Sequence, residues 1–273
     1  MKRLVVVIMV LLCCQTYAQR KPKIKGNRSV VSVSESLPPF EAIVLNDDLD
    51  IVLRKANEEG YSITADDNLI DVLKFKVKDG TLEVSSFYKI TGKKKLEISV
   101  DYVSLNSIVL REGKMETTDI VAGDVVEVAM YGSSKLEMGM DAGLVKVLME
   151  GNSAADLSIK ADTLDVKLKD RVDVGMYTTT QRSTITMEKN SAATLDGTTH
   201  ILSVLLFDNA NLKARKLDAE GVEVIAEGSP SARVYAETDF ELTSKGSSKT
   251  YLSGNPAIEI LEFMDTSQLH KEK

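Results

Sequence analysis

Two alternating segments follow each other in the sequence, ADLSIK at 155–160 and TLDVKL at 163–168. Apolar residues take every second position in both, as Leu157 and Ile159 do in the first. A period of two is typical of a β-strand with one buried face. A small polar corner, Gly151-Asn152-Ser153, precedes them. This stretch predicts a unit of two short strands that follow a tight turn.

The same kind of corner recurs through the second half of the chain. Small polar triplets begin at Gly132, Gly151, Lys189, Asp208, Gly228 and Gly246. Gly132 and Gly151 are 19 residues apart, and six such steps lead from Gly132 to Gly246. Asp170-Arg171-Val172 falls on the same grid without the small residues. A repeat at a fixed period predicts stacked structural units.

A coil of this length cannot bury its apolar side alone, but stacked coils bury a continuous column and pair their backbones. We therefore expect an all-β fold, a right-handed parallel β-helix (solenoid) with coils of about 19 residues. A β-sandwich also has short strands but does not require this register. The expected inward residues are Leu157, Ile159, Leu164, Val166, Leu168, Val172, Val174, Ile185, Met187, Leu195, Val204, Leu206, Leu212, Val222, Val224, Val234, Phe240 and Leu242.

The N-terminal residues carry a targeting pattern. A basic start, Lys2-Arg3, precedes an apolar run from Leu4 to Leu12 and a small residue, Ala18. This pattern predicts a signal peptide at residues 1–18. Cys13 and Cys14 match a lipoprotein signal poorly, because Leu12 and Cys13 precede them, so lipid anchoring is the less favoured alternative. Cleavage after Ala18 leaves no cysteine for a disulfide or a thiol site.

The remaining chain is acidic and divides into three parts. Loss of Lys2 and Arg3 takes the net charge from −7 to −9, which argues against binding nucleic acid through a general basic surface. Residues 19–39 are expected to be a basic linker that ends in Leu37-Pro38-Pro39. Alternation runs through 40–256, interrupted near Asp66 by one helical turn or less. Residues 257–273 are expected to form a C-terminal strand and a polar tail.

Several segments resemble one bacterial family. They are FEAIVLN at 40–46, LDIVL at 49–53, ITADDNL at 63–69, VKDGTLEV at 77–84 and YLSGNP at 251–256. Together they are similar to the putative auto-transporter adhesin, head GIN domain family, over residues 40–256. The resemblance implies an exported β-helical domain and brings no catalytic residues. The chain departs from the pattern at Asp170-Arg171-Val172, where the Gly-Ser corner is missing.

Parallel β-helices also include polysaccharide lyases and hydrolases, which need paired carboxylates, or calcium carboxylates with a base. Candidate acids are Asp47-Asp48, Asp66-Asp67, Asp162 with Asp165, and Asp170 with Asp173. None has a neighbouring histidine, and each is more simply a turn residue or a solvated strand position. Short loops leave little material for a cleft wall. We therefore predict no catalytic residues and no enzyme.

The sequence contains no motif with the spacing of a known metal or cofactor site. His200 and His270 have no ligand spacing around them, and the run Asn46-Asp47-Asp48-Asp50 lacks the glycine and final glutamate of a calcium loop. Lys93-Lys94-Lys95 is expected to be a solvated loop, and no phosphate-cradling glycine loop occurs. We expect no metal and no cofactor.

The sequence therefore predicts a non-catalytic, exported cell-envelope protein with an adhesin-like binding or interaction role. Flat ladders of polar side chains, such as those of 177–180, are suited to a glycan or an envelope protein. The alternatives are a polysaccharide-acting enzyme and a structural component whose end coils pair with another chain. We expect no nucleic-acid partner, membrane contact only through a lipid anchor, and a location in the periplasm or at the cell surface or outer membrane.

Overall fold

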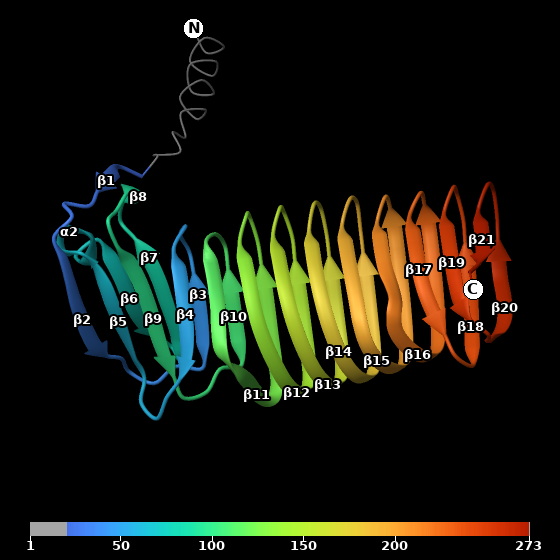
Figure 1. Cartoon of the computed structure of the whole chain (residues 1–273), viewed down its shortest axis with the longest axis horizontal. Coiled ribbons are helices and arrows are strands. Elements are labelled where there is room, and N and C mark those ends of the chain that lie inside the picture. The colour runs from blue at the N-terminus through green and yellow to red at the C-terminus, as the bar shows by residue number, and fades with distance from the viewer. Residues whose placement is uncertain (1–20, 273) are drawn as a thin grey trace, which may run out of the picture.

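The computed structural model describes residues 21–272 as one elongated solenoid (Figure 1). The chain is 71% strand and 2% helix and makes about nine turns, with coils about 19 residues apart. The predicted parallel β-helix is confirmed. The predicted signal peptide, with Cys13 and Cys14, lies outside the described residues.

The elements fall into an N-terminal group and a run of long strands. The N-terminal group is β1 (Lys23–Lys25), β2 (Val30–Ser36), β3 (Ala42–Leu45), β4 (Asp50–Lys55), β5 (Gly60–Asp66), α2 (Asp67–Ile70), β6 (Leu73–Lys78), β7 (Thr81–Ser86), β8 (Lys89–Gly92), β9 (Leu96–Tyr102) and β10 (Ser107–Leu110). The rest are β11 (Lys114–Met130), β12 (Lys135–Met149), β13 (Ala154–Leu168), β14 (Asp173–Met187), β15 (Ala192–Asp208), β16 (Asn211–Gly228), β17 (Ser231–Ala236), β18 (Asp239–Ser244), β19 (Lys249–Gly254), β20 (Ala257–Phe263) and β21 (Gln268–Lys271).

Each long strand supplies both faces of its coil by bending near its middle. At the bend Asp162 has no register partner, whereas its neighbours Ala161 and Thr163 pair with Ala142 and Leu144. The first halves of β11 to β16 form the first sheet with β9, β4, β17, β19 and β21. The second halves form the second sheet with β7, β3, β10, β18 and β20. In the coils of β11 to β16, the two short strands that the sequence predicts are therefore the two halves of one continuous strand.

The core is the column of side chains between the two sheets. Every inward residue that the alternation predicted is buried, and residues in successive coils stack, as Leu157 does between Met138 and Met176. Burial of one Leu or Ile side chain stabilises a protein by about 1.5–3 kcal/mol. Because the column is continuous, each coil depends on its neighbours for its core.

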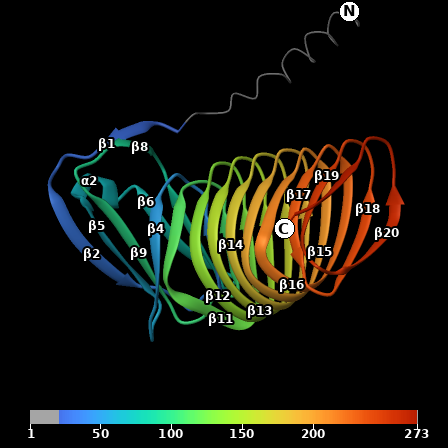
Figure 2. The same cartoon turned by 45° about the vertical axis from the view of Figure 1, so that its right-hand side comes forward.

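The N-terminal end of the solenoid is closed by a cap of antiparallel strands (Figure 2). β5 pairs antiparallel with β9 and with β2, and Ile63, Ala65 and Leu69 form a small core of their own there. The chain order is broken at this point, because β7 and β9 stack outside β3 and β4. Residues 30–36 were expected to belong to a linker and instead form β2, with Val33 packed against this small core.

The C-terminal end has one strand more than the sequence predicted. The expected polar tail contains β21, which pairs with β19, while β20 pairs with β18. No other strand among residues 21–272 pairs with the outer edges of β20 and β21. Ile258, Ile260 and Phe263 of β20 are consequently exposed, so the solenoid is capped at one end and open at the other.

Candidate functional site

A shallow hollow of about 490 Å³ lies on the first sheet across β11 to β15. Glu137, Asp156 and Asp196 supply its carboxylates, and Tyr177, which is 60% exposed, supplies an aromatic ring. Its floor is low because Gly139 and Gly175 occupy outward positions where other coils carry side chains. The hollow is thus a largely apolar surface that carries three carboxylates and one exposed aromatic ring.

Strand register determines which of these side chains are neighbours. One outward column contains Glu137, Asp156, Gly175 and Thr194, and the next contains Gly139, Ser158, Tyr177 and Asp196. Adjacent strands lie about 4.8 Å apart, so Glu137 and Asp156 are direct neighbours of like charge. A Cβ at Gly175 would lie 2.9 Å from Asp156 Oδ1, so the glycine makes room for that carboxylate.

A second hollow, of about 440 Å³, adjoins the first on the same sheet. Lys114, Lys135 and Asp173 line it together with Glu137 and Asp156. Lys114 Nζ donates a hydrogen bond of 2.8 Å to Glu116 Oε2, and this bond and the charge of Glu116 raise the pKa of Lys114. Carboxylates and ammonium groups spaced along a flat strand face can hydrogen-bond hydroxyl groups of an extended ligand.

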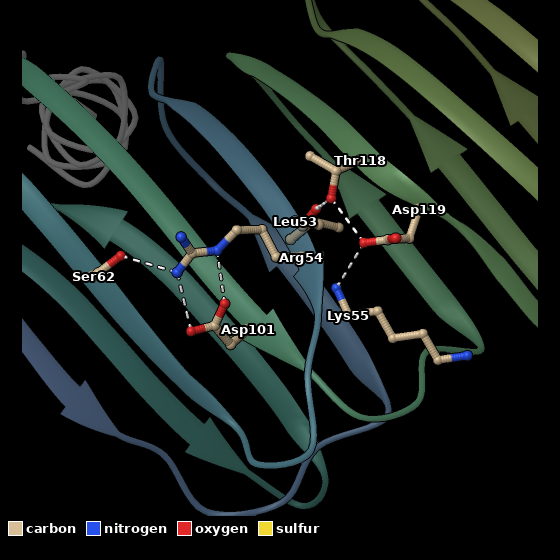
Figure 3. A network of polar contacts seen from close by, with 7 residues as sticks. All are labelled: Leu53, Arg54, Lys55, Ser62, Asp101, Thr118 and Asp119. Atoms are coloured by element: carbon tan, nitrogen blue, oxygen red, sulfur yellow. Dashed lines mark hydrogen bonds and ion pairs between the residues drawn. The ribbon is translucent and has the colours of Figure 1, made fainter.

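A polar network joins the cap to the solenoid (Figure 3). The Arg54 guanidinium donates two hydrogen bonds to the Asp101 carboxylate, from Nε to Oδ1 at 2.8 Å and from Nη2 to Oδ2 at 3.1 Å. Arg54 Nη2 also donates a hydrogen bond to Ser62 Oγ. Nearby, Asp119 Oδ2 accepts hydrogen bonds from Thr118 Oγ1 and the Lys55 backbone N–H, which lower the pKa of Asp119. These contacts tie β4 to β5, β9 and β11, and their role is structural.

The acids singled out in the sequence do not converge. Asp47 accepts hydrogen bonds from Lys21 and from the Ser86 N–H, and Asp170 pairs with Lys189. Asp66 is buried, and its carboxylate accepts hydrogen bonds from the backbone N–H groups of Lys94, Arg28 and Lys95. The bond from Lys94, together with the other two, lowers the pKa of Asp66, although burial alone would raise it.

The other predicted acids are also dispersed. Asp67 accepts a hydrogen bond from Asn27, Asp162 lies at the bend of its coil, and Asp165 lies on the second sheet. Of all the predicted acids, only Asp173 lines a hollow of the first sheet.

The two histidines lie apart. His200 Nδ1 is 3.6 Å from Glu220 Oε1 at the bend between the sheets, and the His270 ring stacks on Tyr251. Among residues 21–272, no group of three or more His, Cys, Asp or Glu side chains is placed to hold a metal ion. Within the same residues, no helix is long and apolar enough to cross a membrane.

Sequence reasoning missed most residues of the hollow. Within 177–180 only Tyr177 and Thr179 face outward, because Thr178 and Thr180 are buried, and Thr180 Oγ1 bonds Thr199 Oγ1 inside the core. A usable signal existed in Gly139 and Gly175, since glycine in the middle of a strand marks a close approach or a gap in the side-chain layer.

Comparison with known proteins agrees with this architecture. The family model described as "Putative auto-transporter adhesin, head GIN domain" matches residues 39–178 and 154–256. The chain belongs to this family. The head GIN match runs from β3 to β19, so it includes the long coils and both hollows but leaves out β1, β2, β20 and β21. No curated protein matches the sequence.

Solved structures similar to this head GIN protein share its fold at low identity. A putative adhesin from Parabacteroides merdae is 14% identical, with a TM-score of 0.69, over 92% of this chain and 100% of that one. A putative lipid binding protein from Parabacteroides distasonis is 19% identical, with a TM-score of 0.65 and the same coverage. A putative adhesin from P. distasonis is 15% identical, with a TM-score of 0.67, over 91% and 99% of the two chains.

Proposed function

We propose that this head GIN protein is an exported, non-catalytic module of the cell envelope that binds a glycan on its first sheet. One observation carries the proposal: the exposed ring of Tyr177 lies among the carboxylates of Glu137, Asp156 and Asp196 in one open hollow. Aromatic faces pack on the apolar faces of sugars, and carboxylates accept hydrogen bonds from their hydroxyl groups. Family membership and the adhesin descriptions of similar structures support a binding role.

The first test is glycan binding by the purified chain without residues 1–18, on an array of neutral and acidic glycans. We expect Tyr177→Ala to weaken binding of the preferred neutral glycan about tenfold, because the stacking face is removed. Phe87→Ala is the matched control. Phe87 is an aromatic side chain of similar exposure (58%), but it lies in the loop between β7 and β8 and does not line the hollow. Equal binding by wild type and Tyr177→Ala would contradict the proposal.

Location is tested separately by protease treatment of intact cells, with a periplasmic protein as the control. Loss of the domain from intact cells supports an adhesin at the surface. Protection until the outer membrane is permeabilised would contradict surface adhesion and leave a binding role in the periplasm.

The second candidate function is a structural part of an envelope assembly. The open C-terminal coil favours it, because Ile258, Ile260, Leu261 and Phe263 are exposed beside an unpaired strand edge. Unpaired edges with apolar side chains are sites where another chain can add a strand. Cross-linking in intact cells through a photoreactive residue at position 261 would trap such a partner, whereas a cross-link only to glycan near position 177 would favour the first function.

A further inference from the structure

A second feature of the first sheet lies nearer its C-terminal end. One outward column there consists of Lys213, Arg233, Tyr251 and His270, which we call the basic ladder. Register pairs Lys213 with Arg233, Arg233 with Tyr251, and Tyr251 with His270 across four successive strands. The ladder is therefore a straight row that runs along the solenoid axis.

The aromatic half of the ladder is stacked. The guanidinium of Arg233 lies 4.5 Å from the centroid of the Tyr251 ring. The Tyr251 and His270 rings are parallel within 14°, with centroids 4.9 Å apart. Stacking holds the Arg233 guanidinium in a fixed plane and leaves its N–H groups able to bind a carboxylate or sulfate in a bidentate manner.

The basic half of the ladder has an uncompensated charge. Lys213 and Arg233 are direct cross-strand neighbours, an arrangement of like charges that destabilises a sheet. Within the described part of the chain, neither forms an ion pair with a carboxylate, and the same holds for Lys249 in the adjacent column. The whole chain has a net charge of −7, so this row of basic side chains is opposite in sign to the protein as a whole.

We propose that the basic ladder binds an acidic polysaccharide, a chain of sugars that carry carboxylate or sulfate groups. An anionic ligand would remove the repulsion between Lys213 and Arg233, and the stacked rings offer flat faces to its sugars. The ladder is open and repeats about every 4.8 Å, which suits an extended polymer rather than an enclosed small anion. The ladder continues the outward column that ends at Thr194 of the hollow, since Thr194 pairs with Lys213, but it contains none of the residues that line the Tyr177 hollow, and the proposal does not rest on that hollow.

The test compares binding of the chain without residues 1–18 to heparin (sulfated), polygalacturonate (carboxylated) and dextran (neutral) at low and high salt. We expect binding to at least one acidic polymer, none to dextran, and a steep loss with salt. The double variant Lys213→Glu/Arg233→Glu should bind the acidic polymer at least about tenfold more weakly. Lys213→Gln/Arg233→Gln should also weaken binding, and it keeps the test valid if the reversed charges prevent folding.

Two control variants distinguish binding at the basic ladder from a general charge effect and from binding at the hollow. Lys146→Glu/Lys167→Glu reverses the same number of charges on the second sheet and should leave acidic-polymer binding unchanged. Tyr177→Ala should also leave it unchanged, although it weakens the binding proposed for the hollow. The proposal is overturned if wild type binds neither acidic polymer, if the Lys146/Lys167 control loses binding equally, or if anionic phospholipid vesicles are bound more tightly than both polymers.

Discussion

At the scale of single residues, the turn that starts each coil depends on one backbone position with positive φ. Glycine occupies it in some coils, as at Gly132 (φ +62°) and Gly151 (φ +83°), where a Cβ would lie within 3 Å of a carbonyl oxygen in the coil below. Asp170, Lys189 and Asp208 adopt the same region without glycine. Their side chains compensate by bonding along the column: Lys189 pairs with Asp170, and its N–H donates to Asp208 Oδ2. The corner at Asp170 therefore keeps the common turn geometry.

Asp66 is the residue from which we expect a pH effect. Its pKa is lowered in the folded protein, so the carboxylate stabilises the fold above the unfolded value of about 3.9, and this contribution is lost as pH falls through the folded pKa. Asp66→Asn should lower the free energy of unfolding at pH 7. It should also make that free energy fall less steeply between about pH 4 and pH 2. Thermal unfolding across this range measures both effects. Asp162→Asn, at an exposed bend, is the control, and an equal change in both variants would refute the assignment.

At the scale of elements, apolar residues that are register partners in adjacent strands should contribute differently to stability. Leu242 of β18 is fully buried, whereas its register partner Ile260 of β20 is 49% exposed at the open end. Leu242→Ala should lower the free energy of unfolding by about 2–5 kcal/mol, and Ile260→Ala by about 1 kcal/mol. Urea unfolding followed by circular dichroism measures the difference. Similar losses would indicate that something covers the C-terminal coil in solution.

At the scale of the whole molecule, stability should vary along the axis. Coils contact only their neighbours, and β20 and β21 have neighbours on one side, while the other end is closed by the antiparallel cap. Hydrogen exchange should therefore be fastest in β20 and β21, slowest in β13 and β14, and intermediate in β5 and β9. Mass spectrometry of peptides from a native-state exchange series measures this order. Uniform exchange of all coils would contradict it and indicate a single cooperative unit.

The sequence by itself determined the repeat and the inward face of each strand. Leu157, Ile159 and Leu164 are buried as their alternation predicts, because the direction of a side chain in a strand follows from local geometry. The 19-residue spacing predicts the stacking, because a coil of this size has no other way to bury its apolar side. Family resemblance over 40–256 agrees with the family match.

Only the tertiary structure decided how the ends are built and which side chains meet. The pairing of β2 with β5, and the position of β7 and β9 outside β3 and β4, join segments far apart in the sequence. The alternation of apolar and polar residues does not specify which strands pair, because every strand edge presents the same backbone donors and acceptors. For the same reason the hollow around Tyr177 and the basic ladder emerge only when the coils are aligned in register.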